Sequence, residues 1–287
     1  MWKVILAAFL CMAVFLSGAW AAEPVVIGAY LSMTGNVAAY GQMAWSGISI
    51  GKKMRSEVMG RPVDVKLADT KSDKIESANA VSRLIEKDKA VAIIGEMISG
   101  NTIAGGAVAE KSGIPMISPT ATNPIVTQEK KWISRVCFID TDQGRVIAKL
   151  ALDQLKSKKA ALIYDVSQDY SVGLAAFFKR EFTKGGGTIV SDTKFKTGDR
   201  DFNPQLSSIK ASGAEFICAP IYYTECALLA KQAKAMGLNI PILDGDGVQA
   251  PELLELGGAE VENIYFTTHF HKDMITSERG KKFLQIF

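Results

Sequence analysis

The residues with the clearest chemical potential in this sequence are the hydroxyls of the stretch SPTATNP, Ser118 to Pro124. A loop needs few polar residues to turn, whereas this one carries three hydroxyls, an amide and two prolines. Proline fixes its own backbone angle and so limits the conformations of the segment. Hydroxyl and amide groups both donate and accept hydrogen bonds, so this stiff loop is a candidate binding site for a small polar ligand.

Similar polar segments follow the other predicted strands. They are MTGNVAAYG, GEMISGNT, DVSQDYSVG, PIYYTE and DGDGVQ. Each of them alone is explained by helix capping, because Ser, Thr, Asn and Asp cap helices routinely. Ligands of open parallel sheets, however, bind beyond the carboxyl ends of the strands, which is where all these segments fall. Their common position favours one ligand site assembled from several loops.

The motifs that mark common enzymes are not found in the sequence. We find no G-x-S-x-G nucleophile elbow, no G-x-G-x-x-G after a strand and no P-loop. His269 and His271 have a spacing that occurs among metal ligands, but at an exposed strand end this spacing is incidental, and no Cys/His cluster accompanies it. We therefore predict no catalytic residue, no metal and no cofactor; a secreted enzyme is the alternative class.

The elements that must position the loops are apolar strands alternating with amphipathic helices. In the first half, strands are predicted over 25–31, 63–69, 90–95 and 114–118, and helices over 38–54, 75–88 and 101–111. The pattern restarts after ISRVCFID at 133–140. Strands then follow over 160–165, 188–195, 214–220, 240–245 and 263–270, with helices over 143–156, 170–184, 203–212, 223–237 and from about 276. The alternation predicts two α/β lobes, each a parallel sheet covered by helices, with a cleft between them.

The ends of the chain set the expected domain limits. Residues 1–21 resemble a secretory signal peptide, with Lys3 before an apolar run and Ala19-Trp20-Ala21 as the cleavage signal. The apolar run is short for a membrane span, so a retained anchor is the alternative and an exported protein is expected. The lobes are expected at residues 22–140 and 141–268, and residues 269–287 begin a return to the first lobe.

Composition bears on the size of the fold, on the class of partner and on disulfide bonding. The chain has 287 residues, a net charge of +3 and 48% hydrophobic residues, which suits two globular domains and argues against a nucleic-acid partner. Three cysteines follow the signal peptide, which is not the pattern of a disulfide scaffold. Cys218 and Cys226 either pair or are buried as apolar residues.

Five segments, taken in order, carry a family resemblance. They are LSMTGNVAAYGQMAWSGISI, IGEMISGNTIAGGAVAEKSGIPMISPTATNP, DYSVGLAAFFKREFTKGGGTIV, DRDFNPQLSSIKASGAEFI and GLNIPILDGDGV. Over residues 23–287 the chain resembles the periplasmic leucine/isoleucine/valine-binding proteins of ABC transporters. The resemblance implies a type I periplasmic-binding fold, with two Rossmann-like lobes joined by a hinge, and a periplasmic, monomeric protein that delivers an amino acid to a membrane permease. It also implies further strands and helices after Phe287, so C-terminal elements are expected to be missing.

The resemblance assigns binding roles to the loops of the first lobe. Ser99 stands where the family holds the α-carboxylate of the ligand, at the start of a helix whose free N–H groups and dipole favour an anion. Thr120 and Thr122 stand where the family binds both carboxylate and ammonium, and Ala121 lies between them. Ile98 replaces a residue that is a disulfide-bonded cysteine in some relatives, and no such disulfide is predicted here.

The resemblance assigns the α-ammonium of the ligand to the second lobe. Asp246 matches the acidic residue, often Glu in the family, that takes the α-ammonium through a charge-assisted hydrogen bond. Tyr170 and Tyr222 match aromatic residues that close over the ligand, and Tyr40 matches one from the first lobe. Tyr223 is an alternative to Tyr222, because the sequence does not separate adjacent tyrosines.

The ligand that follows from these assignments is an aliphatic or other uncharged amino acid. No Arg or Lys stands among the assigned positions to meet a side-chain carboxylate, and a ligand without an ammonium would leave the buried acid unpaired. The resemblance leaves open a sensory receptor for an amide, an aromatic acid or a polar amino acid. The binding lobes alone do not separate sensing from transport.

Overall fold

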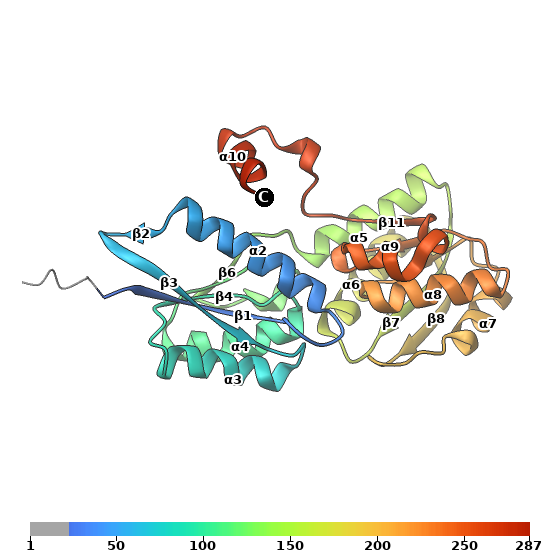
Figure 1. Ribbon diagram of the computed structural model, residues 1–287. Helices are drawn as coiled ribbons and strands as arrows, with labels where there is room; N and C mark the ends of the chain where they lie inside the picture. Colours follow the sequence, from blue (N-terminus) through green and yellow to red (C-terminus); the bar gives the residue numbers. More distant parts are fainter. Residues whose placement is uncertain (1–22) are drawn as a thin grey trace, which may run out of the picture.

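The computed structural model describes residues 23–287, and the predicted signal peptide lies outside these residues. The chain forms two sheets that lie side by side, each flanked by helices (Figure 1), so the predicted α/β fold with two lobes is confirmed. We call the part that contains the sheet of residues 25–135 the first lobe, and the part that contains the sheet of residues 159–266 the second lobe. The boundary at residue 140 stays a prediction. Among residues 23–287, no helix combines the length and the apolarity needed to cross a bilayer.

The first lobe is built on a six-stranded sheet of order β2-β3-β1-β4-β5-β6. Only β2 is antiparallel, pairing with β3 as a hairpin that was not predicted. The strands are β1 (Val25–Leu31), β2 (Glu57–Val58), β3 (Arg61–Asp69), β4 (Ala92–Ile94), β5 (Met116–Ser118) and β6 (Ile133–Arg135), and the helices are α2 (Ala38–Met54), α3 (Lys74–Glu86) and α4 (Ser99–Ser112). Capping explains two of the boundaries. The Asp73 carboxylate accepts the N–H groups of residues 75 and 76 before α3, and Gly113 takes a left-handed conformation after α4.

The second lobe is built on a five-stranded sheet of order β11-β10-β9-β7-β8, in which all pairs are parallel. Its strands are β7 (Lys159–Asp165), β8 (Thr188–Phe195), β9 (Phe216–Cys218), β10 (Ile242–Asp244) and β11 (Ile264–Phe266). Its helices are α5 (Asp140–Lys149), α6 (Asp169–Lys184), α7 (Asn203–Ala211), α8 (Tyr223–Ala235) and α9 (Pro251–Gly257), and α5 continues as a π-helical turn over Leu150–Gln154. Three stacked and edge-on rings, Phe178, Phe182 and Phe216, are fully buried in its core.

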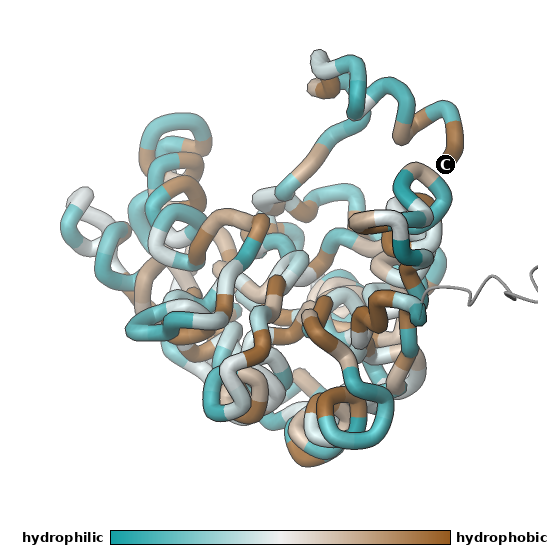
Figure 2. The backbone as a smooth tube through the Cα atoms, turned by 90° about the vertical axis from the view of Figure 1, so that its left-hand side faces the viewer, coloured by the Kyte–Doolittle hydropathy of each residue, from teal (hydrophilic) through white to brown (hydrophobic). Residues whose placement is uncertain are grey.

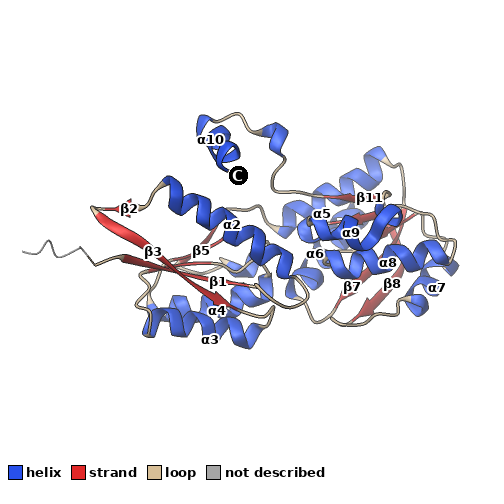
Figure 3. Cartoon of the chain, viewed as in Figure 1, coloured by secondary structure: helices blue, strands red, loops and turns tan. Residues whose placement is uncertain are grey.

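Several elements differ from the sequence expectation in extent. The segment 133–140 pairs only over Ile133–Arg135, after which the chain crosses between the lobes and Asp140 begins α5 (Figure 3). The segment 263–270 pairs only over β11, because β10 offers three residues as partners. Helix α9 was not predicted; its seven residues are too few to show a helical period, although Pro251 in the first turn is a typical start.

After Phe270, which still lines the cavity between the lobes, the chain extends away from the two lobes, as two views agree (Figures 1 and 2). It contains a short 3-10 turn, Lys272–Met274, and α10 (Glu278–Ile286), which confirms the helix expected from about residue 276. The hydroxyl of Ser277 caps α10 by accepting the N–H of Gly280. None of the residues of α10 is buried.

The three cysteines of the described chain are free. Cys218 and Cys226 are buried and unpaired, so the alternative in which they pack as apolar residues is confirmed. Burial raises the pKa of both thiols, which keeps them protonated and unreactive.

Candidate functional site

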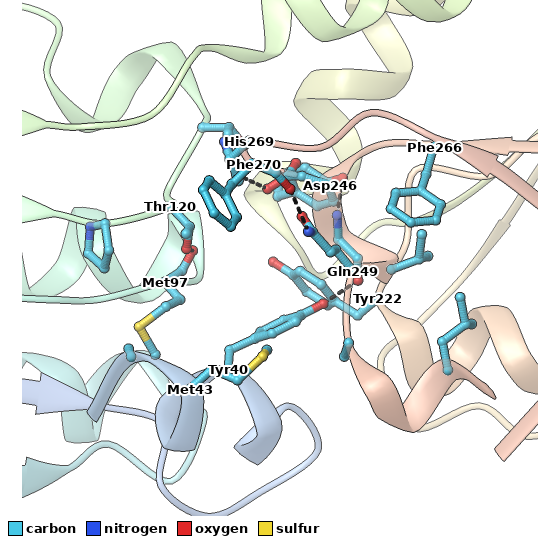
Figure 4. A pocket seen from close by; sticks show the side chains of 18 of the residues that line it. Tyr40, Met43, Met97, Thr120, Tyr222, Asp246, Gln249, Phe266, His269 and Phe270 are labelled. Atoms are coloured by element: carbon cyan, nitrogen blue, oxygen red, sulfur yellow. Dashed lines mark hydrogen bonds and ion pairs between the residues drawn. The ribbon is translucent and has the colours of Figure 1, made fainter. Parts of the chain in front are cut away.

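A cavity of about 590 Å³ lies between the two lobes. The loops that follow β4, β5 and β10 all reach it, as expected for ligands that bind beyond the carboxyl ends of parallel strands. Figure 4 shows Met97 and Thr120 entering from the first lobe and Asp246, Gln249 and Phe266 from the second. Of the nine residues expected at the site, seven line this cavity: Tyr40, Ser99, Thr120, Thr122, Tyr170, Tyr222 and Asp246.

The first-lobe wall presents three hydroxyls. Ser99 is the first residue of α4, and its Oγ accepts the N–H of Asn123 at 3.2 Å. The Thr120 hydroxyl donates to the carbonyl of Met97 at 3.3 Å, while the buried hydroxyl of Thr122 has no hydrogen-bond partner among the described residues. The N–H groups in the first turn of a helix have no intrahelical acceptor, so this wall offers donors to an anion.

Ile98 and Ala121 do not line the cavity. Ile98 is buried, and its N–H donates to the carboxylate of Glu96 at 2.8 Å. Ala121 is fully buried, and its N–H donates to the Ser118 hydroxyl at 3.2 Å. Both therefore lie one layer behind the surface that a ligand would touch, where they hold the backbone of the loops.

Arg135 anchors the loop that carries the two threonines. Its guanidinium donates to the carbonyls of Ala121 and Asn123 at 2.9 Å each, to that of Pro124 at 3.0 Å, and to the Thr127 hydroxyl at 2.7 Å. The planar fork of arginine suits several acceptors fixed in one plane. The rigidity expected from the prolines is thus reinforced by a residue from the neighbouring strand, which was not expected from the sequence.

Tyrosines close the cavity from both lobes. Tyr170 and Tyr222 are stacked with ring centroids 5.4 Å apart, and the ring of Tyr40 meets that of Tyr222 edge-on at 6.1 Å. The Tyr40 hydroxyl donates across the lobes to the carbonyl of Gly247, and burial raises the pKa of all three phenols, so they stay neutral. Tyr223, the alternative to Tyr222, is not part of the lining; its ring packs edge-on against Tyr40 at 5.2 Å.

Asp246 lies on the second-lobe wall, at the start of the 3-10 turn Asp246–Val248 that follows β10. Its side chain is only 10% exposed. Oδ1 accepts from the Gln143 amide at 2.7 Å, and Oδ2 lies 2.8 Å from Nε2 of His269. The carboxylate is therefore held in place from two sides, with its free lone pairs as the remaining acceptor capacity.

His269 is a site residue that sequence reasoning missed. The expectation that it stands at an exposed strand end is wrong, because its side chain is 18% exposed, lines the cavity and pairs with Asp246. Its ring stacks on Phe138 with centroids 4.2 Å apart. The only hint in the sequence is its place just after the last strand of the second lobe, on the side where ligands bind.

Most of the remaining lining is apolar. Its larger side chains are Met43, Met97, Leu253, Leu254, Phe266 and Phe270. Among the described residues that line the cavity, none is Lys or Arg. The space is suited to an apolar group between polar ends, as small-molecule sites commonly are.

The geometry of the cavity is that of a binding site. Contrary to the expectation from the sequence, one G-x-S-x-G spacing is present, GISIG at Gly47–Gly51. It lies inside α2, not at the strand-to-helix turn where a nucleophile elbow stands. Ser99, the serine of the lining, accepts the backbone N–H of Asn123 at 3.2 Å. Hydrogen bonding, charge pairing and apolar contact are the chemistry that this cavity offers.

Comparison with known proteins shows relatives over nearly the whole described chain. Residues 24–287 match the family described as periplasmic binding protein. Leu/Ile/Val-binding protein homolog 3 of Brucella melitensis is 30% identical over 275 residues, which are 94% of this chain and 73% of that protein.

Two solved structures extend the comparison. A leucine binding protein LivK from Thermotoga maritima is 44% identical with a TM-score of 0.90, over 91% of this chain and 75% of that one. The branched-chain amino acid transporter substrate binding protein LivJ from Streptococcus pneumoniae, solved in complex with isoleucine, is 32% identical with a TM-score of 0.85, over 92% of this chain and 76% of that one. The chain belongs to the periplasmic binding protein family, whose members are non-enzymatic solute-binding proteins of ABC transporters.

Proposed function

We propose that the protein captures an uncharged aliphatic amino acid outside the cytoplasm and delivers it to the permease of an ABC transporter. The observation that carries the proposal is that one cavity joins the hydroxyls of Ser99, Thr120 and Thr122 on one lobe to the carboxylate of Asp246 on the other. Such an arrangement suits a zwitterion with its two charges at opposite walls. The relatives named for leucine or solved with isoleucine support the same ligand class.

The carboxylate of the ligand would bind at the start of α4. There the Ser99 hydroxyl and the first N–H groups of the helix act together, and the helix dipole adds an attraction of about 0.3–1 kcal/mol to an anion. Thr120 could donate to the same group only by releasing the carbonyl of Met97, to which its hydroxyl donates at 3.3 Å. The buried hydroxyl of Thr122 has no hydrogen-bond partner among the described residues, and a ligand would satisfy it.

The ammonium of the ligand would bind against Asp246. Because Gln143 contacts Oδ1 and His269 contacts Oδ2, the ammonium would use the lone pairs that remain on these oxygens or move the imidazole aside. The apolar residues of the lining would then contact the aliphatic side chain. A ligand with a second carboxylate would find no Lys or Arg among the described residues that line the cavity.

Contacts between the lobes support capture by closure. Lys74 pairs with Asp169 at 2.7 Å, the Asn123 amide donates to the backbone carbonyl of Asp169 at 2.8 Å, and the Thr224 hydroxyl donates to the carbonyl of Asn36 at 3.0 Å. A ligand that contacts both walls adds to these contacts only when the lobes meet, so it shifts the population toward the closed form. A micromolar affinity corresponds to about 8 kcal/mol of net binding free energy.

The test is a thermal-shift panel followed by calorimetry. The panel contains the twenty amino acids, acetamide, benzoate, and two relatives of leucine that lack one charge each, 3-methylbutylamine and 4-methylpentanoate. A ligand that binds only the folded protein raises its Tm. We expect leucine, isoleucine or valine to raise the Tm and both one-charge relatives to fail.

A matched pair of variants locates the site. Ser99→Ala should weaken leucine binding by about tenfold, since a hydrogen bond to a charged group contributes about 1.5–3 kcal/mol and the helix N–H groups remain. Ser46→Ala, on the exposed face of α2, should not change the Kd. A rise of Tm with acetamide or benzoate and none with amino acids would replace the proposed ligand class.

A further inference from the structure

Gln143 ties Asp246 to the beginning of the second lobe. Its amide N–H groups donate to Oδ1 of Asp246 at 2.7 Å and to Oδ1 of Asp140 at 3.0 Å. Its carbonyl oxygen accepts the backbone N–H of Asp246 at 3.0 Å and the hydroxyl of Thr267. All donors and acceptors of the amide are therefore used, and its orientation is set by the backbone N–H that it must accept. One side chain thus places two acids in contact with the same nitrogen.

Asp140 is an acid for which the binding contacts described above give no role. It is the first residue of α5, fully buried, and its N–H donates to the carbonyl of Thr122 at 3.0 Å. Its Oδ2 has no hydrogen-bond partner among the described residues, and the nearby Thr122 hydroxyl lacks one as well. Burial and the negative charge of Asp246 together raise the pKa of Asp140 to about 8. The hydroxyl of Thr122 and the amide of Gln143 lower this pKa, but they do not outweigh burial and the charge of Asp246, so the neutral acid is favoured at neutral pH.

The negative charge of Asp246 raises the pKa of Asp140, and a cation bound to Asp246 would reduce this effect. Both Oδ1 atoms accept from the same nitrogen, so they are no more than about 5.7 Å apart. The fixed positive charge nearby, Arg135, is already engaged by the carbonyls of the binding loop. The titratable groups around Asp140 and its partner are Arg135, Cys137, Tyr170, Tyr222, Asp246 and His269.

We propose that Asp140 is a second acid of the cation site, which holds a proton while no cation faces Asp246 and releases it to solvent when the ammonium of a ligand binds there. This inference rests on the proposed function. The ammonium neutralises the charge of Asp246, which repels an ionised Asp140, and it also attracts that ionised form directly. The cost of burial remains, so the release is partial. The proton passes from the Asp140 carboxyl to a buffer base, and no bond other than this O–H is broken.

The expected number of protons released follows from the pKa of Asp140 before and after the ligand binds. An opposite charge within about 4–6 Å lowers the pKa of a carboxyl by about 1–3. A fall from about 8 to about 7 would raise the ionised fraction of Asp140 at pH 7.5 from about one quarter to about three quarters. About half a proton would then be released for each ligand bound.

The experiment is calorimetry of leucine binding at pH 7.5 in phosphate, HEPES and Tris. The slope of the observed enthalpy against the ionisation enthalpy of the buffer is minus the number of protons released, because the buffer takes these protons up and protonation is the reverse of its ionisation. We expect about half a proton for the wild type and none for Asp140→Asn, which keeps the shape and the contact with Gln143. The matched control is Asp142→Asn, an exposed acid in the same helical turn that pairs with Arg145 and should leave the slope unchanged.

The outcomes separate this inference from the proposed function. Leucine binding with a zero slope in the wild type, or with the same slope in Asp140→Asn, overturns the inference and leaves the amino-acid proposal standing. Failure of all amino acids to bind overturns the proposed function and this inference with it. Should Asp140→Asn not fold, carbon NMR of the aspartate carboxyls in the wild type decides the question. An aspartate that titrates between pH 6 and 9 must then move to lower pH when leucine is added, and no such response would overturn the inference.

Discussion

Replacing Asp246 by Asn removes a negative charge from the cavity while keeping the shape of the side chain. The Asn oxygen can still accept from Gln143, as Oδ1 of Asp246 does at 2.7 Å. The new amide N–H can donate to Nε2 of His269 if the imidazole carries its proton on the other nitrogen. We therefore expect the folded protein to keep its structure and its Tm within a few degrees.

The loss of affinity for an amino acid should be large, because the site is dry. The side chain of Asp246 is only 10% exposed, so an ammonium bound there loses most of its water. A hydrogen bond to a charged group contributes about 1.5–3 kcal/mol, and an ion left buried without its partner costs about 3–5 kcal/mol. A loss between about 2 and 4 kcal/mol corresponds to a roughly 30- to 700-fold rise in the Kd for leucine.

The assay is calorimetric titration of both proteins with leucine and with 4-methylpentanoate, which lacks only the amino group. The acid leaves Asp246 without a cation in the wild type, so Asp246→Asn should bind it as well as the wild type does, or more tightly. Equal weakening for both ligands would show that Asp246 acts through closure or folding instead of the ammonium. An unchanged Kd for leucine would refute its assignment to the cation site.

Three further predictions concern stability and closure. Gly105→Ala should lower the unfolding free energy by about 1–3 kcal/mol, because a Cβ at this position would meet a buried tyrosine ring at 2.5 Å. Gly47 has open space around it, so Gly47→Ala should raise the unfolding free energy by about 0.5–1 kcal/mol; urea titrations measure both changes. Lys74→Ala removes the exposed ion pair with Asp169 and should weaken ligand binding less than about fivefold, an effect that disappears in high salt; a larger or salt-independent change would contradict a surface contact. The pKa of Asp140 is raised from 3.8 to about 8, so the folded state keeps a proton that the unfolded chain releases, and wild-type stability falls as pH rises through that window. Asn cannot titrate, so the unfolding free energy of Asp140→Asn should rise relative to that of the wild type between pH 4 and 8. A difference in unfolding free energy that stays constant over this range would mean that Asp140 does not titrate there.

The order of the elements was predictable because it depends on short-range patterns. The strand VVIGAYL and the helix at 38–54 were expected with the limits that the structure has. The strand at 263–270 was expected too long, because an apolar run continues where no partner strand does. Strand length is set by pairing, and β11 ends where the register with β10 ends.

Of the candidate site, the hydroxyl loop and the tyrosines were predictable from their position after strands and from the family resemblance. Ile98 and Ala121 were expected at the surface of the cavity, but their backbone N–H groups are used within the first lobe. A sequence does not show which of two neighbouring residues turns inward. Such a choice depends on the path of the loop, which Glu96, Ser118 and Arg135 decide from other elements.

The two α/β lobes and the loops that reach the cavity could be predicted from the sequence alone. These properties follow from periodicity, capping and residue chemistry, which are local. Tertiary folding, in contrast, sets three features that no local pattern predicts: Gln143 contacts Asp246 across 103 positions, His269 contacts the same carboxylate, and Asp140 is fully buried. Contacts of this kind arise where two sheets and a crossing segment meet, and the burial that raises the pKa of Asp140 exists only once they have met.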